Sequence, residues 1–145
     1  MIYVVESNFK RQIELLNSVA LIHAKTNLVA WLYQESEAKT VAGLVVSSES
    51  QGFVPVTTYG CGDVSQQGLN TIPKEFNASV VSALVKNKTE ILELYDSLAL
   101  YQPNQNEWYA CVIHHENMCL VKDESMLEKL KQQNFTASTE APPWW

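Results

Sequence analysis

The chain of 145 residues matches the usual size of one domain, and 46% of its residues are hydrophobic, enough to build a sizeable core. A formal net charge of −6, with no basic cluster to offset it, disfavours direct contact with nucleic-acid phosphates. Three cysteines do not suit a secreted disulfide framework, and no segment is typical of a signal peptide or a bilayer span. We therefore expect one globular domain over residues 1–145, cytoplasmic and without membrane contact.

Apolar runs separated by polar turns make up the first half of the chain. Residues 2–5 are β-branched or aromatic and predict a strand, and residues 9–22 carry apolar side chains at helical spacing. The runs 28–33 and 40–47 flank a short polar loop, which predicts an antiparallel hairpin. The next run, 53–58, contains a proline that cannot donate to a ladder, so we place it at a sheet edge or at a break.

Helical spacing dominates the middle of the second half. Residues 60–72 contain three glycines and predict a loop, after which one apolar helical phase continues over residues 73–101. The phase fits either one long helix or two. A second hairpin is predicted from residues 107–114 and 118–122, followed by a short helix and a final strand over residues 134–138.

Hairpins outnumber β-α-β crossovers in this order of elements. A chain of that kind folds more readily as an antiparallel sheet than as a doubly wound parallel one. The predicted class is therefore α+β, with a mostly antiparallel sheet of five to seven strands and three or four helices packed largely on one face.

The segment from Cys111 to Cys119 holds the densest group of reactive side chains, with His114 and His115 between the cysteines. A hairpin there would place both cysteines on the same sheet face and both histidines at its tip. Zinc needs about four converging ligands, typically including two cysteines two to four residues apart. Two small buried side chains on neighbouring strands explain these cysteines better. We predict no metal and no cofactor.

A small enzyme is an alternative, built from Cys61 in its glycine-flanked loop and from His114 or His115 as a base. Nothing in the sequence brings these residues together. The chain also lacks the phosphate-loop, dinucleotide, nucleophile-elbow and zinc-protease motifs. We therefore assign no catalytic residue.

Charge is unevenly distributed along the chain. No Lys or Arg occurs between Lys88 and Lys122, whereas Glu90, Glu93 and Asp96 fall there with two further acids. On a helix these three acids would occupy an exposed face opposite the apolar arc. Ordinary surfaces mix both signs of charge, so an unmixed acidic face favours association with a basic partner.

In size, acidity and lack of catalytic motifs, the chain resembles bacterial immunity proteins that block nuclease toxins. The resemblance implies a small binding protein that neutralises a basic partner by occlusion, its acidic face covering the partner's cationic groove. The expected contact residues are four acids that supply charge and three aromatic anchors: Glu90, Glu93, Asp96 and Glu107, with Tyr101, Trp108 and Trp144.

The last residues of the sequence suggest a third possibility, a structural or assembly subunit. Residues 142–145 read Pro-Pro-Trp-Trp. A pair of tryptophans in this position either folds back on the domain or anchors an interface. The tail would be the contact in an assembly subunit.

Overall fold

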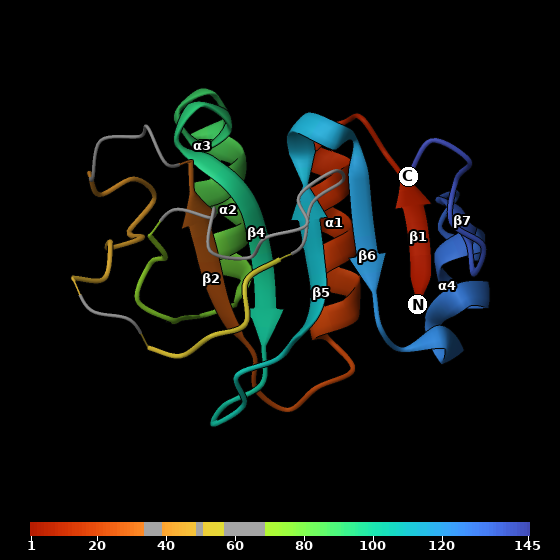
Figure 1. Cartoon of the computed structure of the whole chain (residues 1–145), viewed down its shortest axis with the longest axis horizontal. Helices are drawn as coiled ribbons and strands as arrows, with labels where there is room; N and C mark the ends of the chain where they lie inside the picture. The colour runs from red at the N-terminus through yellow and green to blue at the C-terminus, as the bar shows by residue number, and fades with distance from the viewer. Residues whose placement is uncertain (34–38, 49–50, 57–68) are drawn as a thin grey trace.

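The computed structural model describes residues 1–33, 39–48, 51–56 and 69–145. Its centre is a seven-stranded sheet in which every neighbouring pair is antiparallel, in the order β3-β2-β4-β5-β6-β1-β7 (Figure 1). The strands are β1 (Ile2–Val5), β2 (Asn27–Leu32), β3 (Lys74–Glu75), β4 (Tyr95–Tyr101), β5 (Trp108–Ile113), β6 (Met118–Val121) and β7 (Thr136–Ser138). The helices are α1 (Phe9–Ala20), α2 (Ala78–Lys86), α3 (Lys88–Leu94) and α4 (Leu127–Gln132). This confirms the predicted α+β class.

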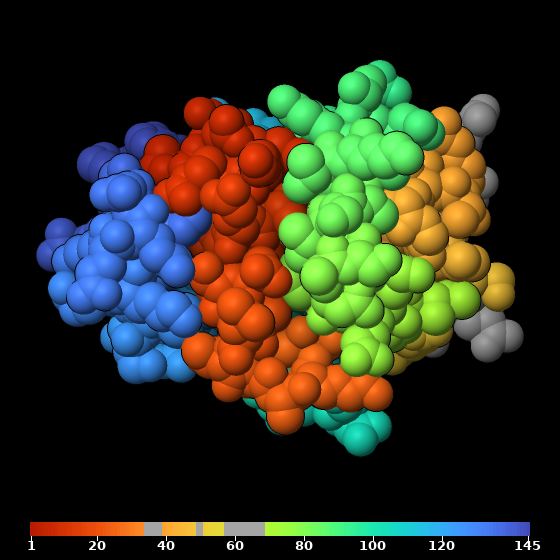
Figure 2. Space-filling view, turned by 180° about the vertical axis from the view of Figure 1, so that it is seen from behind, coloured from red at the N-terminus to blue at the C-terminus, as the bar shows by residue number. Residues whose placement is uncertain are grey.

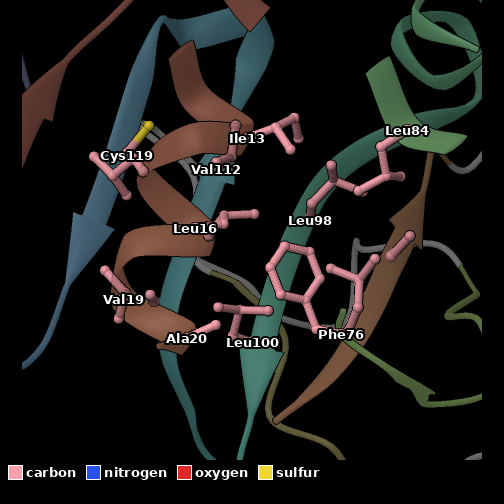
Figure 3. Close-up of a cluster of buried hydrophobic side chains, with 14 of the residues drawn as sticks. Ile13, Leu16, Val19, Ala20, Phe76, Leu84, Leu98, Leu100, Val112 and Cys119 are labelled. Carbon is pink, nitrogen blue, oxygen red and sulfur yellow. The ribbon is translucent and has the colours of Figure 1, made fainter. Parts of the chain in front are cut away.

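One face of the sheet carries the helices. Asn8 caps α1 by accepting a hydrogen bond from the Arg11 amide (3.1 Å), and the apolar stripe of α1 then points at the sheet. Figure 3 shows Leu16 of this stripe directed towards β4, on the side of the strand where Leu98 and Leu100 lie. From behind, α1 and α2 lie side by side over the strands (Figure 2). Burying each large apolar side chain contributes about 2 kcal/mol, which makes this layer the main core.

The opposite face of the sheet has its own buried apolar cluster, to which the helices contribute no residue. Trp31 and Tyr101 belong to it and are almost or fully buried. Phe53 and Trp145, partly buried, pack against it from two distant parts of the chain. The central strands are therefore buried on both faces.

The predicted hairpin of residues 28–33 and 40–47 is wrong. β2 pairs with β3 and β4, and residues 40–47 form only isolated bridges. Ala42 and Gly43 have φ values of 53° and 74°, which close a tight turn within this segment. Its end then pairs with residues 70–72, which lie along β2. Of the loop predicted over residues 60–72, residues 60–68 lie outside the described residues.

The predicted helical phase over residues 73–101 holds only in part. The chain forms β3, then α2 from the Asn77 cap and α3 after Asn87, and becomes extended at Tyr95. The predicted helix over residues 95–101 is wrong, because β4 is a central strand with apolar side chains on both faces, a pattern that resembles a buried helix. The question of one helix or two is settled as two.

The remaining predictions largely agree with the structure. β1, α1, the β5–β6 hairpin, the short helix α4 and the last strand β7 all form close to their predicted positions. Residues 53–56 are not a strand, and residues 57–58 lie outside the described residues. Among the residues that the structure describes, no helix is long and apolar enough to cross a membrane.

Candidate functional site

Five polar side chains meet where β5 turns into β6, at one end of the sheet. We call them the histidine-turn cluster: Tyr33, Asp96, His114, His115 and Glu116. The Tyr33 hydroxyl lies 3.2 Å from His115 Nδ1 and 3.5 Å from His114 Nε2. Asp96 Oδ1 lies 3.4 Å from His115 Nδ1, and Glu116 Oε1 lies 3.6 Å from His115 Nε2. The imidazole of His115 is thus held between two carboxylates.

A bulge in β4 places Asp96 in this cluster. Trp31 pairs with Ser97 and Leu32 pairs with Tyr95, so Asp96 is an extra residue on its strand. A bulge interrupts the alternation of side chains and can redirect one of them. Asp96 consequently leaves the apolar pattern of β4 and reaches His115.

The two histidines lie on the 3-10 turn η2 (His114–Glu116). Asn117 ends the turn in the left-handed region at φ 52°, and its amide donates to the His114 carbonyl (3.1 Å). Asparagine tolerates this conformation better than most residues. The Glu6 amide donates to the Asn117 carbonyl (2.9 Å), which ties the turn to the end of β1.

Burial determines the protonation of the inner members. Burial lowers the pKa of His114 to about 4, assisted by His115 and opposed by the Leu92 backbone. His114 is therefore neutral at physiological pH. Burial also raises the pKa of the Tyr33 hydroxyl, with Asp96 and Glu116 adding to the effect, so Tyr33 keeps its proton.

Burial raises the pKa of Asp96 as well, and the charge of Glu116 acts in the same direction. The His115 imidazole opposes this by favouring the charged carboxylate. The cluster therefore has two acids, one partly exposed imidazole and two neutral groups, an arrangement that can hold a cation. Among the described residues, no group of three or more His, Cys, Asp or Glu is arranged to hold a metal ion.

The four predicted acidic contact residues do not form one patch. Glu90 and Glu93 are exposed on α3, which leads directly to Asp96 in β4. Glu107 lies beyond the far end of β4, about 20 Å away at the rise of an extended strand. Its carboxylate contacts Lys122 Nζ (2.9 Å). Three of the four acids are thus at the end of the sheet that carries the histidine turn.

A cation distant in sequence also enters the acidic stretch. Lys39 Nζ lies 3.4 Å from Glu90 Oε2, although the stretch contains no Lys or Arg of its own. The face is therefore less purely acidic than the linear sequence suggests. A charge pattern along the chain does not reveal cations brought in by folding.

The predicted aromatic anchors differ sharply in exposure. Tyr101 is predicted to be a contact residue at the end of a helical phase, but it lies on β4 with none of its surface exposed. Its hydroxyl donates to the Val54 carbonyl (2.6 Å) and accepts from Trp31 Nε1 (3.2 Å). Trp108 is 7% exposed, with Lys122 Nζ 4.5 Å from the ring centre. Trp144, at 48% exposed, is the accessible member of the three.

The two cysteines of the predicted hairpin point to opposite faces of the sheet. Cys111 pairs with Leu120, and Cys119 pairs with Val112, a register one residue away from the expected one. Figure 3 shows Cys119 on the α1 side. Both thiols are buried, and burial raises the pKa of each. Neither is a reactive thiolate; Cys61 of the enzyme alternative lies outside the described residues.

The sequence singles out the histidines but not the residues that surround them in the fold. Tyr33 and the Asp96–His115 contact depend on β2, β4 and η2 being neighbours, which no local pattern indicates. Fold and site define an α+β protein with an acidic, histidine-containing cluster at one end of its sheet. No family model, curated protein or solved structure matches the chain.

Proposed function

We propose that this protein binds a basic protein partner and neutralises it by covering its cationic surface, as an immunity protein does a nuclease toxin. The contact surface is the acidic end of the sheet, defined as Glu90, Glu93, Asp96 and Glu116. The observation that supports this is the convergence of α3, β4 and η2, each of which brings carboxylates to the same end.

The four acids differ in exposure and therefore in their expected roles. Glu90 and Glu93 are exposed, and charges of this kind mainly accelerate diffusional encounter with an oppositely charged partner. The side chains of Asp96 and Glu116 are each 15% exposed. Partly desolvated carboxylates make stronger charge-assisted hydrogen bonds to an incoming guanidinium or ammonium group. Trp144 adds an exposed aromatic surface.

Charge reversal at the two exposed acids tests the proposal. We expect E90K/E93K to slow association with a fluorescent nona-arginine peptide roughly tenfold at low salt, and less as salt rises. Stopped-flow fluorescence measures the rate. The matched control, E75K/E140K, changes two other exposed acids and gives the same net charge. Equal rates for the two variants would rule out steering by this end of the molecule.

A small enzyme is the second candidate, because Tyr33, His115 and Asp96 are acid–base groups in close contact. The nucleophile proposed for it is Cys61. If a substrate screen finds turnover, C61A is expected to abolish it while leaving binding to the arginine peptide unchanged. Turnover that survives C61A would remove Cys61 from the mechanism, and binding lost in C61A would contradict its independence from the acidic end.

A further inference from the structure

His115 occupies an unusual electrostatic position within the histidine-turn cluster. It has a carboxylate against each ring nitrogen, Asp96 at 3.4 Å and Glu116 at 3.6 Å. An imidazolium carries an N–H on both nitrogens and can donate towards both acids. A neutral imidazole has only one N–H, so one of the two carboxylates then faces a ring nitrogen that donates nothing.

Of the other groups around His115, two are neutral and two are acids, and burial raises the pKa of one of these acids, Asp96. From the end of β2, Tyr33 contributes a protonated hydroxyl, and within η2 the buried His114 is neutral above about pH 4. From β4, Asp96 supplies one negative charge, and Glu116 supplies the other. On α3, Glu90 is paired with Lys39. Histidine is the side chain that ordinarily changes charge between about pH 5 and pH 8.

We infer that His115 is a built-in counter-ion that competes with the basic groups of the partner for Asp96 and Glu116. When His115 is protonated, the cluster already contains a cation and attracts another one less. When His115 is neutral, an arginine or lysine of the partner takes over that role. Partner binding and protonation of His115 therefore oppose each other, and binding releases a proton.

The burial of these groups makes the competition effective. Asp96 and Glu116 are mostly shielded from water, and His115 itself is 37% exposed. Interactions between charges are stronger in such surroundings than in bulk solvent. An arginine suits the replacement best, because its planar fork can donate to a carboxylate through two N–H groups at once. The inference rests on the proposed function, since it concerns how the same acidic end of the sheet binds the basic partner.

Two substitutions separate the charge states of His115. H115Q keeps a polar side chain that is always neutral, and H115K supplies one that is always positive. Equilibrium binding of the nona-arginine peptide is measured at low salt between about pH 5.5 and pH 8. The wild-type protein should bind about three- to tenfold more weakly at the lower pH. H115Q should bind tightly and H115K weakly, each with a much smaller pH dependence.

His23 provides the matched control. It is a partly exposed histidine whose Nδ1 lies 3.0 Å from Gln102 Nε2, after the end of α1 and away from the histidine turn. H23Q should retain the pH dependence of the wild-type protein. NMR titration of the His115 ring should give the same midpoint as the binding curve, and the midpoint should move to lower pH when the peptide is present.

The possible outcomes distinguish the counter-ion role of His115 from the proposed binding of a basic partner. If the peptide fails to bind at pH 8, where His115 is least charged, both are wrong. If the peptide binds but H115Q and H115K have equal affinities, the counter-ion role is wrong and the binding function stands. A His115 midpoint that the peptide does not move also contradicts the inference, whatever the affinities. Thermal unfolding of each variant verifies that the comparison is between folded proteins.

Discussion

His114 is the buried member of the histidine pair, with only 8% of its surface exposed. Its pKa in the folded protein is about 4, below the ordinary value of 6.5, because burial disfavours the charged ring. The unfolded chain therefore takes up a proton at this residue at a higher pH than the folded protein does. Stability that is present above pH 6.5 is consequently lost as the pH falls towards 4.

This linkage predicts the effect of removing the titrating ring. Between pH 7 and pH 4.5 we expect the free energy of unfolding of the wild-type protein to fall by about 2 kcal/mol more than that of H114Q. Urea denaturation at the two pH values measures the difference. Contributions from the other titrating groups are shared by the two proteins and cancel to first order. Parallel losses in both proteins would mean that His114 is protonated in the fold or solvated.

At the level of elements, the sequence predicted best where one face of an element is buried and the other is not. The helix α1 is of this kind, with an apolar stripe and a capping Asn8, and it forms where expected. The β5–β6 hairpin was also located, although its register was one residue off. Register depends on the turn, and the left-handed Asn117 after η2 could not be read from residue types alone.

The prediction failed where an element is buried on both sides. β4 presents Leu98 and Leu100 to the helical layer and Ala99 and Tyr101 to the other face. Such a strand is apolar throughout, and over seven residues this run fits a helical phase as well as an extended chain. The wrong assignment placed Asp96 on an exposed helix face and Tyr101 in the apolar phase of the same helix. The wrong positions predicted for these two residues thus follow from the wrong secondary structure predicted for β4.

The sequence predicts only some of the residues at the acidic end of the sheet, for a related reason. Glu90, Glu93 and Asp96 are close in sequence, so they lie at the same end of the sheet even though Asp96 is on a strand and not on the predicted helix. Glu107 did not stay with them, because β4 separates it from them by its whole length. Tyr33 lies far away in sequence and joins the cluster only through the pairing of β2 with β4. Tertiary neighbours of this kind carry no local signature.

At the scale of the whole molecule, the sheet separates two apolar layers of different construction. The helices cover one layer, while the other is covered in part by chain ends, since Met1 and Trp145 both pack against it. The C-terminus lies beside β1 in Figure 1. The two terminal tryptophans therefore have different surroundings: Trp145 is partly buried on this layer, whereas Trp144 is 48% exposed.

This difference separates a structural role of the tail from a role in assembly. We expect W145A to lower the free energy of unfolding by about 2 kcal/mol, because it removes a large apolar side chain from the second layer. W144A should change stability by less than about 0.5 kcal/mol, as is usual for exposed positions. Urea denaturation compares them, and light scattering gives the solution mass of both. If the tail holds an assembly together, W144A should have a smaller solution mass than the wild-type protein and the same free energy of unfolding. If the tail only covers the second layer, the solution mass of W144A should be unchanged, and W145A should be the variant that loses stability.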